Sequence, residues 1–154
     1  MSPLPGAGQR GGAAVEFALV LTLLISVLAA IFGFGRAFWY YDALTKASRD
    51  AARAMSVAAK ASIASQGVAA AETLVVEAAA AAGVPDFSAA NVSVVCLDAA
   101  FADATCADGS APGAVRVEIT GYTMSVGQYI PFLLGASRSY TTTLAPRTTM
   151  RYML

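Results

Sequence analysis

Glu16 is the residue whose type and position most clearly call for a chemical role in this sequence. It lies directly before an uncharged run that extends over residues 17–35. As a helix rising about 1.5 Å per residue, this run would span about 28 Å, close to the thickness of the hydrocarbon core of a bilayer. A carboxylate so near an apolar phase is costly unless it is paired or lies at the interface. The sequence therefore predicts a membrane-spanning helix and a partner for Glu16.

Few other side chains are suited to catalysis or metal binding. The sequence contains no histidine, which excludes Ser-His-Asp and Cys-His centres and histidine metal sites. Asp98, Asp103 and Asp108 lack the alternating spacing of an EF-hand calcium loop. Ten basic residues balance ten acidic ones, so no basic excess is available to bind nucleic acid. We expect no enzyme activity, no metal, no cofactor and no nucleic-acid partner.

The two cysteines bear on the compartment of the C-terminal region. Cys96 and Cys106 flank a polar loop, a spacing that suits a small disulfide in an oxidising compartment, with two reduced thiols as the alternative. Basic residues favour the opposite orientation, because Arg10 is the only side-chain cation before the span. The residues that follow the span include Arg36, Lys46, Arg49 and Arg53, diluted by Asp42 and Asp50. Counting cations places the C-terminal side in the cytoplasm, whereas the cysteines favour the outside, which we prefer.

The composition supports membrane attachment by a retained segment. Hydrophobic residues make up 57% of the chain and charged residues 13%, which is too apolar for an ordinary soluble protein. The apolar run is longer than that of a secretory signal, and no small-x-small cleavage site interrupts it before Arg36. We therefore expect the membrane helix to stay in the mature protein.

A single helix is predicted to continue beyond the span to about Lys60. From Ala13 onward no proline interrupts the chain until Pro85. At about 100° per residue the charged side chains share one arc. They are Asp42, Lys46, Arg49, Asp50, Arg53 and Lys60, and a separate apolar arc holds Tyr40, Leu44, Ala47, Ala51, Ala54, Met55 and Ala58. We expect Asp50 to pair with Lys46 and with Arg53, each pair contributing a few tenths of a kcal/mol.

Small residues continue the apolar arc back into the membrane. They are Ser26, Ala29, Gly33 and Ala37. Such spacing lets another helix approach closely in lipid and predicts one packing seam over residues 26–58, although the abundance of alanine is an alternative explanation. Aromatic residues gather where the span should leave the bilayer, as expected at the headgroup level or in packing contacts. They are Phe34, Phe38, Trp39, Tyr40 and Tyr41.

The remainder of the sequence predicts a small α+β domain. A second helix is expected over residues 68–82, ended by Gly83. Alternating residues predict strands at 92–96 and 115–119, and a third strand lies within 137–150, with Pro146 favouring a sheet edge. The apolar segment 129–134 either covers the sheet or contacts lipid. The predicted fold is a long transmembrane and stalk helix, a second helix and a small antiparallel sheet.

The N-terminal motif resembles a known family. Residues 10–17 read Arg-Gly-Gly-Ala-Ala-Val-Glu-Phe, and Phe34-Gly-Arg-Ala and Ala47-Ser-Arg-Asp-Ala-Ala-Arg follow. In combination these segments resemble the TadE-like proteins of the Tad (Flp) pilus system. The resemblance implies a minor pseudopilin that a prepilin peptidase cuts between Gly11 and Gly12. Phe17, in place of the tyrosine common in the major Flp pilin, favours the TadE-like proteins over the shaft subunit.

Cleavage would give the Glu16 carboxylate a specific role in assembly. Gly11 and Gly12 lack a Cβ and offer a peptidase an unhindered segment. The new ammonium on Gly12 would lie near Glu16, and Glu16 of one subunit would neutralise the amine of its neighbour, with Phe17 beside it. The alternative is that Glu16 only complements the helix dipole, worth about 0.3–1 kcal/mol.

Two functional interpretations follow. In the first, residues 1–11 are a cleaved leader, 12–60 the membrane helix and stalk, and 61–154 a periplasmic domain of a single-pass inner-membrane pseudopilin. Its implied partners are the prepilin peptidase, other pilins and pseudopilins, the Tad inner-membrane machinery and lipid. In the second, the chain is an unprocessed membrane-anchored scaffold of the pilus secretion apparatus.

Overall fold

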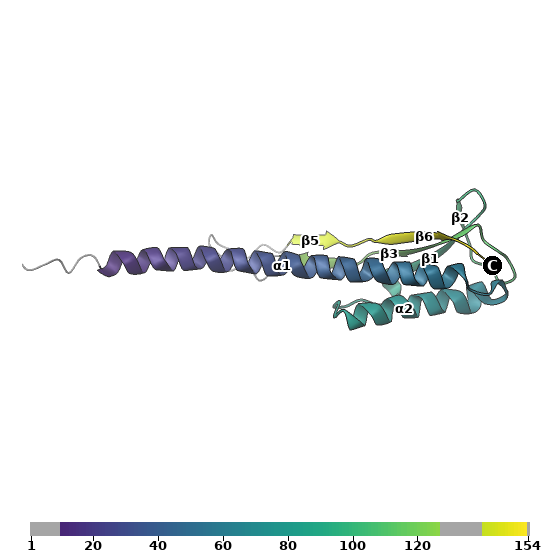
Figure 1. Cartoon of the computed structure of the whole chain (residues 1–154), viewed down its shortest axis with the longest axis horizontal. Coiled ribbons are helices and arrows are strands. Elements are labelled where there is room, and N and C mark those ends of the chain that lie inside the picture. The colour runs from purple at the N-terminus through teal and green to yellow at the C-terminus, as the bar shows by residue number, and fades with distance from the viewer. Residues whose placement is uncertain (1–9, 127–139, 154) are drawn as a thin grey trace, which may run out of the picture. The chain divides into compact units, whose positions relative to one another are not determined.

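The structure is a computed structural model that describes residues 10–126 and 140–153 (Figure 1). The chain divides into two compact units. One unit comprises residues 1–36 and 125–140, and the other comprises residues 37–124 and 141–154. Residues 1–9 of the predicted leader and the apolar segment 129–134 lie outside the described residues.

The first described element is the long helix α1, which covers Arg10–Ser56. It continues past Arg36 as the absence of proline predicts. It also includes the two glycines at the predicted cleavage site, because Gly11 and Gly12 are both helical. Glycine costs only about 1 kcal/mol relative to alanine within a helix, and the residues that follow are good helix formers. The described helix therefore includes Gly11, the last residue of the predicted leader.

The C-terminal end of α1 lies four residues before the predicted Lys60. Ala59 adopts an extended conformation, with ψ at 127°, which stops the helix. A short 3₁₀ turn, η1 (Lys60–Ser62), and a π-helical turn, η2 (Ile63–Gly67), then lead into α2 (Val68–Ala81). Gly83, with φ at +71°, ends this second helix as the sequence predicts.

The main sheet has four antiparallel strands in the order β2-β1-β3-β6. Their bounds are β1 Val92–Leu97, β2 Asp103–Ala104, β3 Ala114–Ile119 and β6 Arg147–Arg151. A separate two-stranded sheet joins β4 (Thr123–Val126) and β5 (Tyr140–Thr143). The turn η3 (Ala89–Asn91) precedes β1. The α+β prediction with a small antiparallel sheet is confirmed.

The predicted third strand is in fact two strands. β5 and β6 lie on either side of Pro146, and each belongs to a different sheet. The Pro146 carbonyl accepts a hydrogen bond from Ile119 N at 2.9 Å, and β6 follows at once as an edge strand. The edge position that Pro146 indicates is therefore correct, but it belongs to β6.

The core of the second unit lies between one face of the sheet and the two helices. Alternate residues of β1 and β3 face it, among them Val92, Cys96, Val115, Val117 and Ile119. Helix α1 contributes Tyr40, Leu44, Ala47, Ala51 and Met55, and α2 contributes Ala71, Val75 and Ala79. Full burial of one large apolar side chain contributes about 1.5–3 kcal/mol. The apolar arc predicted on the stalk is therefore largely occupied by the chain's own domain.

Two details of that stalk differ from the prediction. Ala54 is exposed, and Ser48 is buried instead. Ser48 Oγ donates to Thr45 O at 3.0 Å and lies 3.2 Å from Thr148 Oγ1 of β6, so its burial leaves no unsatisfied hydroxyl. Lys46 Nζ pairs with Asp42 Oδ2 at 2.6 Å rather than with Asp50. Both side chains are exposed, so the pair contributes only a few tenths of a kcal/mol.

Candidate functional site

The N-terminal motif lies at the beginning of α1. Gly11, Gly12, Glu16 and Phe17 are helical and exposed, and 68% of Phe17 is accessible. A Cβ added to Gly11 or Gly12 would meet no atom within 4 Å. Because α1 begins at Arg10, Glu16 is its seventh residue. The motif is thus presented openly on a helix, with its carboxylate beyond the first turn.

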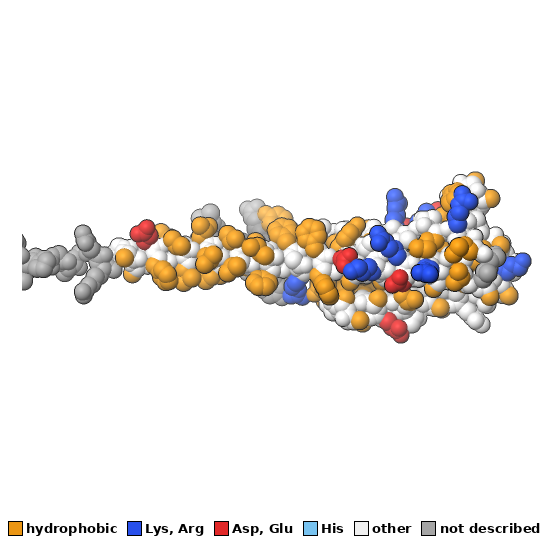
Figure 2. All heavy atoms as spheres, viewed as in Figure 1, with side chains coloured by type: hydrophobic (Ala, Val, Ile, Leu, Met, Phe, Trp, Pro, Cys, Tyr) orange, Lys and Arg blue, Asp and Glu red, His pale blue; other side chains and the backbone are white. Residues whose placement is uncertain are grey.

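Large apolar side chains cover the helix that follows Glu16. Figure 2 shows hydrophobic side chains along the visible face of this first part of α1. The exposed ones include Leu19, Val20, Leu23, Leu24, Val27, Leu28, Ile31 and Phe32. Among the described residues, α1 is the helix long and apolar enough to cross a membrane. It is a candidate membrane anchor, which agrees with the predicted span and with a membrane location.

The small residues of the predicted seam are less accessible than these neighbours. Ser26, Ala29, Gly33 and Ala37 are each partly buried. Ser26 Oγ donates to Thr22 O at 2.8 Å, and Thr22 Oγ1 donates to Ala18 O at 2.7 Å. Hydroxyls bonded to their own helix suit an apolar phase, where an unpaired polar group is costly. Packing of these residues against another subunit stays a prediction.

The aromatic cluster has two kinds of members. Tyr40 is only 5% exposed and belongs to the core of the second unit. Phe34, Phe38 and Trp39 remain more than half exposed, and Trp39 Nε1 donates to Ala82 O at 3.2 Å. The exposed aromatic rings therefore stay candidates for the membrane interface, whereas Tyr40 is a packing residue.

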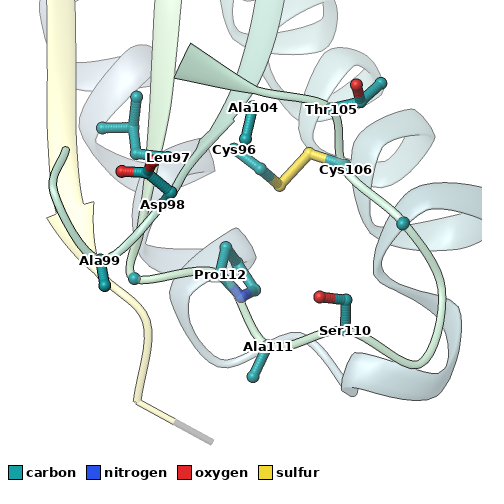
Figure 3. Close-up of a pocket in the computed structure, with 12 residues that line it drawn as sticks. Cys96, Leu97, Asp98, Ala99, Ala104, Thr105, Cys106, Ser110, Ala111 and Pro112 are labelled. Carbon is teal, nitrogen blue, oxygen red and sulfur yellow. A yellow bond between two sulfur atoms is a disulfide. The ribbon is translucent and has the colours of Figure 1, made fainter. Parts of the chain in front are cut away.

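Cys96 and Cys106 form a disulfide, which confirms the predicted bond. It borders a pocket of about 300 Å³, with Ser110, Ala111 and Pro112 on the opposite side (Figure 3). The pocket is lined mainly by backbone and small side chains, and it contains no pair of groups suited to acid–base chemistry among its described residues.

Glycine is required where the chain returns from this loop to β3. A Cβ at Gly113 would lie 2.5 Å from Asp98 O, which is closer than any real contact of this kind. Gly113 N also donates to Leu97 O at 2.8 Å. The two ends of the loop are therefore held together both by the disulfide and by direct backbone contact.

The three aspartates of the cysteine loop serve separate structural purposes. Asp98 Oδ1 accepts hydrogen bonds from Ala100 N at 2.8 Å and Ala102 N at 2.9 Å. Asp103 pairs with an arginine, and Asp108 binds a distant turn. Within the described residues no group of three or more metal-binding side chains comes together.

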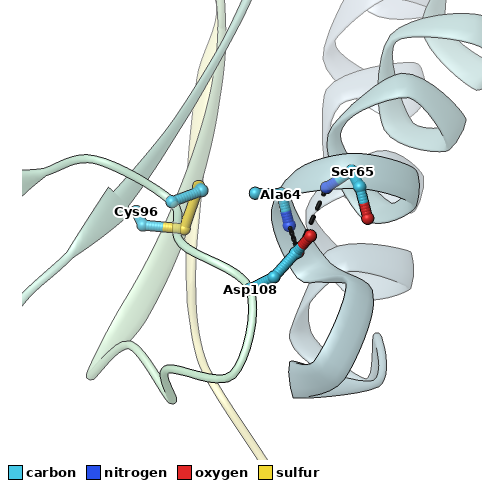
Figure 4. Close-up of a disulfide and its surroundings, with 5 residues drawn as sticks. Ala64, Ser65, Cys96 and Asp108 are labelled. Atoms are coloured by element: carbon cyan, nitrogen blue, oxygen red, sulfur yellow. Dashed lines mark hydrogen bonds between the residues drawn. A yellow bond between two sulfur atoms is a disulfide. The ribbon is translucent and has the colours of Figure 1, made fainter.

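Asp108 connects the cysteine loop to the turn before α2 (Figure 4). Its Oδ1 accepts hydrogen bonds from Ala64 N at 2.7 Å and Ser65 N at 3.1 Å, and the neighbouring Gly109 N donates to Lys60 O at 2.7 Å. Hydrogen bonds from the Ser65 side chain, then from the Ser65 and Ala64 backbone, lower the pKa of Asp108. No local sequence pattern indicates this role, because the partners of Asp108 lie more than forty residues away.

Arg116 forms the main charged cluster on the sheet. It lies 2.6 Å from Asp103 Oδ2 through its Nη2 and 3.2 Å from Glu118 Oε2 through its Nε. The hydrogen bond to Asp103 raises the pKa of Arg116 and lowers the pKa of Asp103. The buried Nε approaches Glu118 without forming an aligned hydrogen bond. This cluster orders the sheet surface and offers no reactive group, because the arginine stays charged.

Comparison with protein families identifies the N-terminal region. Residues 11–53 match the family model described as TadE-like protein. These residues form a TadE-like segment. The match begins at Gly11, contains Glu16 and Phe17, and ends at Arg53 within α1. It confirms the resemblance to TadE-like proteins over this segment.

The C-terminal region, with α2, the sheets and the disulfide, lies beyond the TadE-like match. Comparisons with curated proteins and with solved structures found no match. The function of this region must therefore be argued from its own residues.

Proposed function

We propose that this chain is a minor pseudopilin of a Tad pilus, anchored in the inner membrane by α1 and processed between Gly11 and Gly12. The TadE-like match over residues 11–53 carries this proposal. It coincides with the described start of a helix whose apolar side chains are exposed. Its partners are the prepilin peptidase, other pilins and pseudopilins, and the assembly machinery of the inner membrane.

The position of Glu16 favours a partner charge over the helix dipole. The dipole acts mainly on the first turn, and Glu16 is the seventh residue of α1. After cleavage it would be the fifth residue, still outside the first turn. An ammonium on Gly12 of a neighbouring subunit is a stronger partner, since an unpaired charge at the membrane costs several kcal/mol. Glu16 would then fix the register between subunits.

The disulfide and the length of the domain support a periplasmic location of the second unit. A formed disulfide between Cys96 and Cys106 is typical of an oxidising compartment such as the periplasm. The basic residues after the span point the other way, but the positive-inside rule applies to short loops, and long domains are translocated largely regardless of charge. More than one hundred residues follow Arg36. We therefore place the second unit in the periplasm.

One observation favours the alternative, an unprocessed scaffold. The peptide bond between Gly11 and Gly12 lies within α1, and a peptidase would have to unwind this helix to reach it. The cost is small because two adjacent glycines weaken the helix by about 1 kcal/mol each. An anchor that keeps residues 1–11 would need no unwinding, and the two functions differ in the state of the N-terminus.

Substitution of Glu16 tests the assembly role. In cells that make the pilus, we expect Glu16→Gln to reduce the chain in the sheared pilus fraction about tenfold or more, relative to its amount in membranes. Glu77→Gln, an exposed acid on α2, is the matched control and should behave as the native chain. Normal incorporation of the Glu16→Gln chain would remove the proposed role of Glu16. Absence of the native chain from the pilus fraction would support the scaffold.

A further inference from the structure

The chain between α1 and α2 does not continue as one regular helix. The extended residue Ala59 stops α1, and the 3₁₀ turn η1 and the π-helical turn η2 follow over residues 60–67. Ile63 is the buried residue of this junction, and the residues around it are exposed or half-buried. Short 3₁₀ and π segments beside helices often mark hinges. The rigidity of the junction therefore depends on contacts from elsewhere in the chain.

The cysteine loop supplies such contacts to both turns (Figure 4). Asp108 Oδ1 accepts hydrogen bonds from Ala64 N at 2.7 Å and from Ser65 N at 3.1 Å, in η2. Gly109 N donates to Lys60 O of η1 at 2.7 Å. The two bonds to Asp108 are the stronger ones, because their acceptor is a charged carboxylate. We call these three hydrogen bonds the junction clamp.

The disulfide determines where the clamp residues lie. Asp108 follows Cys106 by two residues, and Cys106 is bonded to Cys96 of β1. Residues 105–113 have no helix or strand of their own. Without the disulfide, only the neighbouring strands β2 and β3 would tie this segment to the sheet. The segment would then sample more conformations, and the effective concentration of the Asp108 carboxylate at the junction would fall.

We propose that the Cys96–Cys106 bond is a redox switch for the junction between α1 and α2. In the oxidised chain the bond holds the junction clamp in place and fixes the junction. In the reduced chain Asp108 leaves the junction while the sheet stays folded. The sheet does not need the clamp, because the buried core includes none of residues 107–112.

The two sulfur atoms differ in their access to an external thiol. Cys96 is 2% exposed, whereas Cys106 is half-buried and lies beside the pocket of about 300 Å³ (Figure 3). A thiolate of an external dithiol attacks Cys106 Sγ, and Cys96 leaves as a thiolate that takes up a proton. The second thiol of the dithiol then attacks its own sulfur in the mixed disulfide. The chain is released with two thiols, and the dithiol becomes a disulfide. The reverse exchange, with the disulfide of an oxidase, forms the bond.

The consequence for assembly rests on the proposed function. A chain made in the reducing cytoplasm would carry two thiols and a loose junction, and it would gain the clamp only in an oxidising compartment. The end of α1 and α2 would therefore form one rigid support only after translocation. The coupling between disulfide and junction depends neither on cleavage after Gly11 nor on the orientation in the membrane, so it can fail or hold independently of them.

Backbone order parameters of the full chain in detergent micelles, measured by NMR before and after treatment with dithiothreitol, test the switch. In the oxidised chain we expect the Ala64 and Ser65 amides to show values of about 0.85, typical of rigid backbone. Reduction should lower them towards about 0.6, because the amides lose their carboxylate acceptor. The amides of β3, which pairs with β1 and β6, should keep their values.

Two variants separate the clamp from a general loosening of the chain. Asp108→Ala should lower the order parameters of Ala64 and Ser65 already in the oxidised chain, and reduction should then add no further change. Glu77→Ala, which removes an exposed acid on α2, is the matched control and should behave as the native chain in both redox states. Unchanged values at Ala64 and Ser65 after reduction would overturn the proposal. An equal loss of order in β3, or a further effect of reduction in the Asp108→Ala chain, would overturn it as well.

Discussion

Asp108 links two regions that are distant in the sequence. Its carboxylate accepts the amides of Ala64 and Ser65, at the turn that leads into α2. Free amides at the beginning of a helical segment are normally satisfied by a residue of that segment. Here the acceptor comes from the cysteine loop, so loop and helix stabilise each other.

The lowered pKa of Asp108 predicts that the stability lost on substitution of this residue depends on pH. Because hydrogen bonds lower its pKa in the folded chain, Asp108 stabilises the fold above the ordinary carboxyl value. This contribution is lost as pH falls through the lowered value. We expect Asp108→Asn to be less stable than the native chain at neutral pH, and the difference to shrink in acid. Urea unfolding at several pH values measures it.

A matched control separates this effect from general charge removal. Asp86 is exposed, and its φ of +55° is tolerated by asparagine as well as by aspartate. Asp86→Asn should therefore leave the pH dependence almost unchanged. If the two variants lost the same stability at every pH, the hydrogen bonds of Asp108 would not be its source.

Local sequence signals indicate some of the candidate residues and not others. Glu16 is recognised by the uncharged run that follows it. Cys96 and Cys106 are recognised by the short polar loop between them. The contacts of Asp108 and the pairing of Arg116 with Asp103 depend on how the sheet and loop fold. No short-range pattern distinguishes these charges from solvated ones.

At the scale of elements, the C-terminal tail holds the end of α1. Tyr152 Oη donates to Ala58 O at 2.6 Å, and Met153 N donates to Ser56 O at 2.9 Å. The last carbonyls of a helix have no partner within it. The tail supplies such a partner for Ser56 O and a second one for Ala58 O, two residues beyond the helix, and so it stabilises the point where α1 stops.

The Tyr152 hydroxyl is therefore expected to contribute to stability. Tyr152→Phe should lower the free energy of unfolding by about 1 kcal/mol, because one partly buried carbonyl loses its donor. Chemical denaturation of the full chain in detergent measures the change. Tyr140→Phe removes a hydroxyl from a side chain that is 66% exposed and is the matched control. An equal loss in both variants would contradict the capping role.

Element boundaries were predicted less well than element types. The sequence predicts α1, α2, β1 and β3 because their patterns are long and regular. It places the end of α1 four residues too late, since the extended Ala59 and the tail contacts have no local signature. The two-residue strand β2 exists only through its pairing with β1. Elements of this kind depend on tertiary contacts that the sequence does not reveal.

At the scale of the whole molecule, the disulfide connects stability with location. Cys96 is buried in the core and Cys106 begins the part of the loop that reaches the turn before α2. Opening a loop of this length costs about 2–4 kcal/mol. We expect dithiothreitol, or the double variant Cys96→Ala and Cys106→Ala, to lower stability by this amount. Thermal unfolding with and without reductant measures it.

The redox state in the cell tests the orientation of the same domain. If the second unit lies in the periplasm, alkylation during lysis should find both cysteines protected until reductant is added. Fully alkylated cysteines without reductant would place the domain in a reducing compartment. The pseudopilin orientation would then be wrong.

The most direct test of the account is the mass of the N-terminal peptide of the chain purified from the membranes of its own cell. The account predicts a chain that begins at Gly12, and a Gly11→Phe variant that keeps residues 1–11. Gly35→Ala lies in the same helix, has open space around its Cβ, and should be processed as the native chain. A native chain that still carries residues 1–11 in cells with an active peptidase would contradict processing and favour the scaffold.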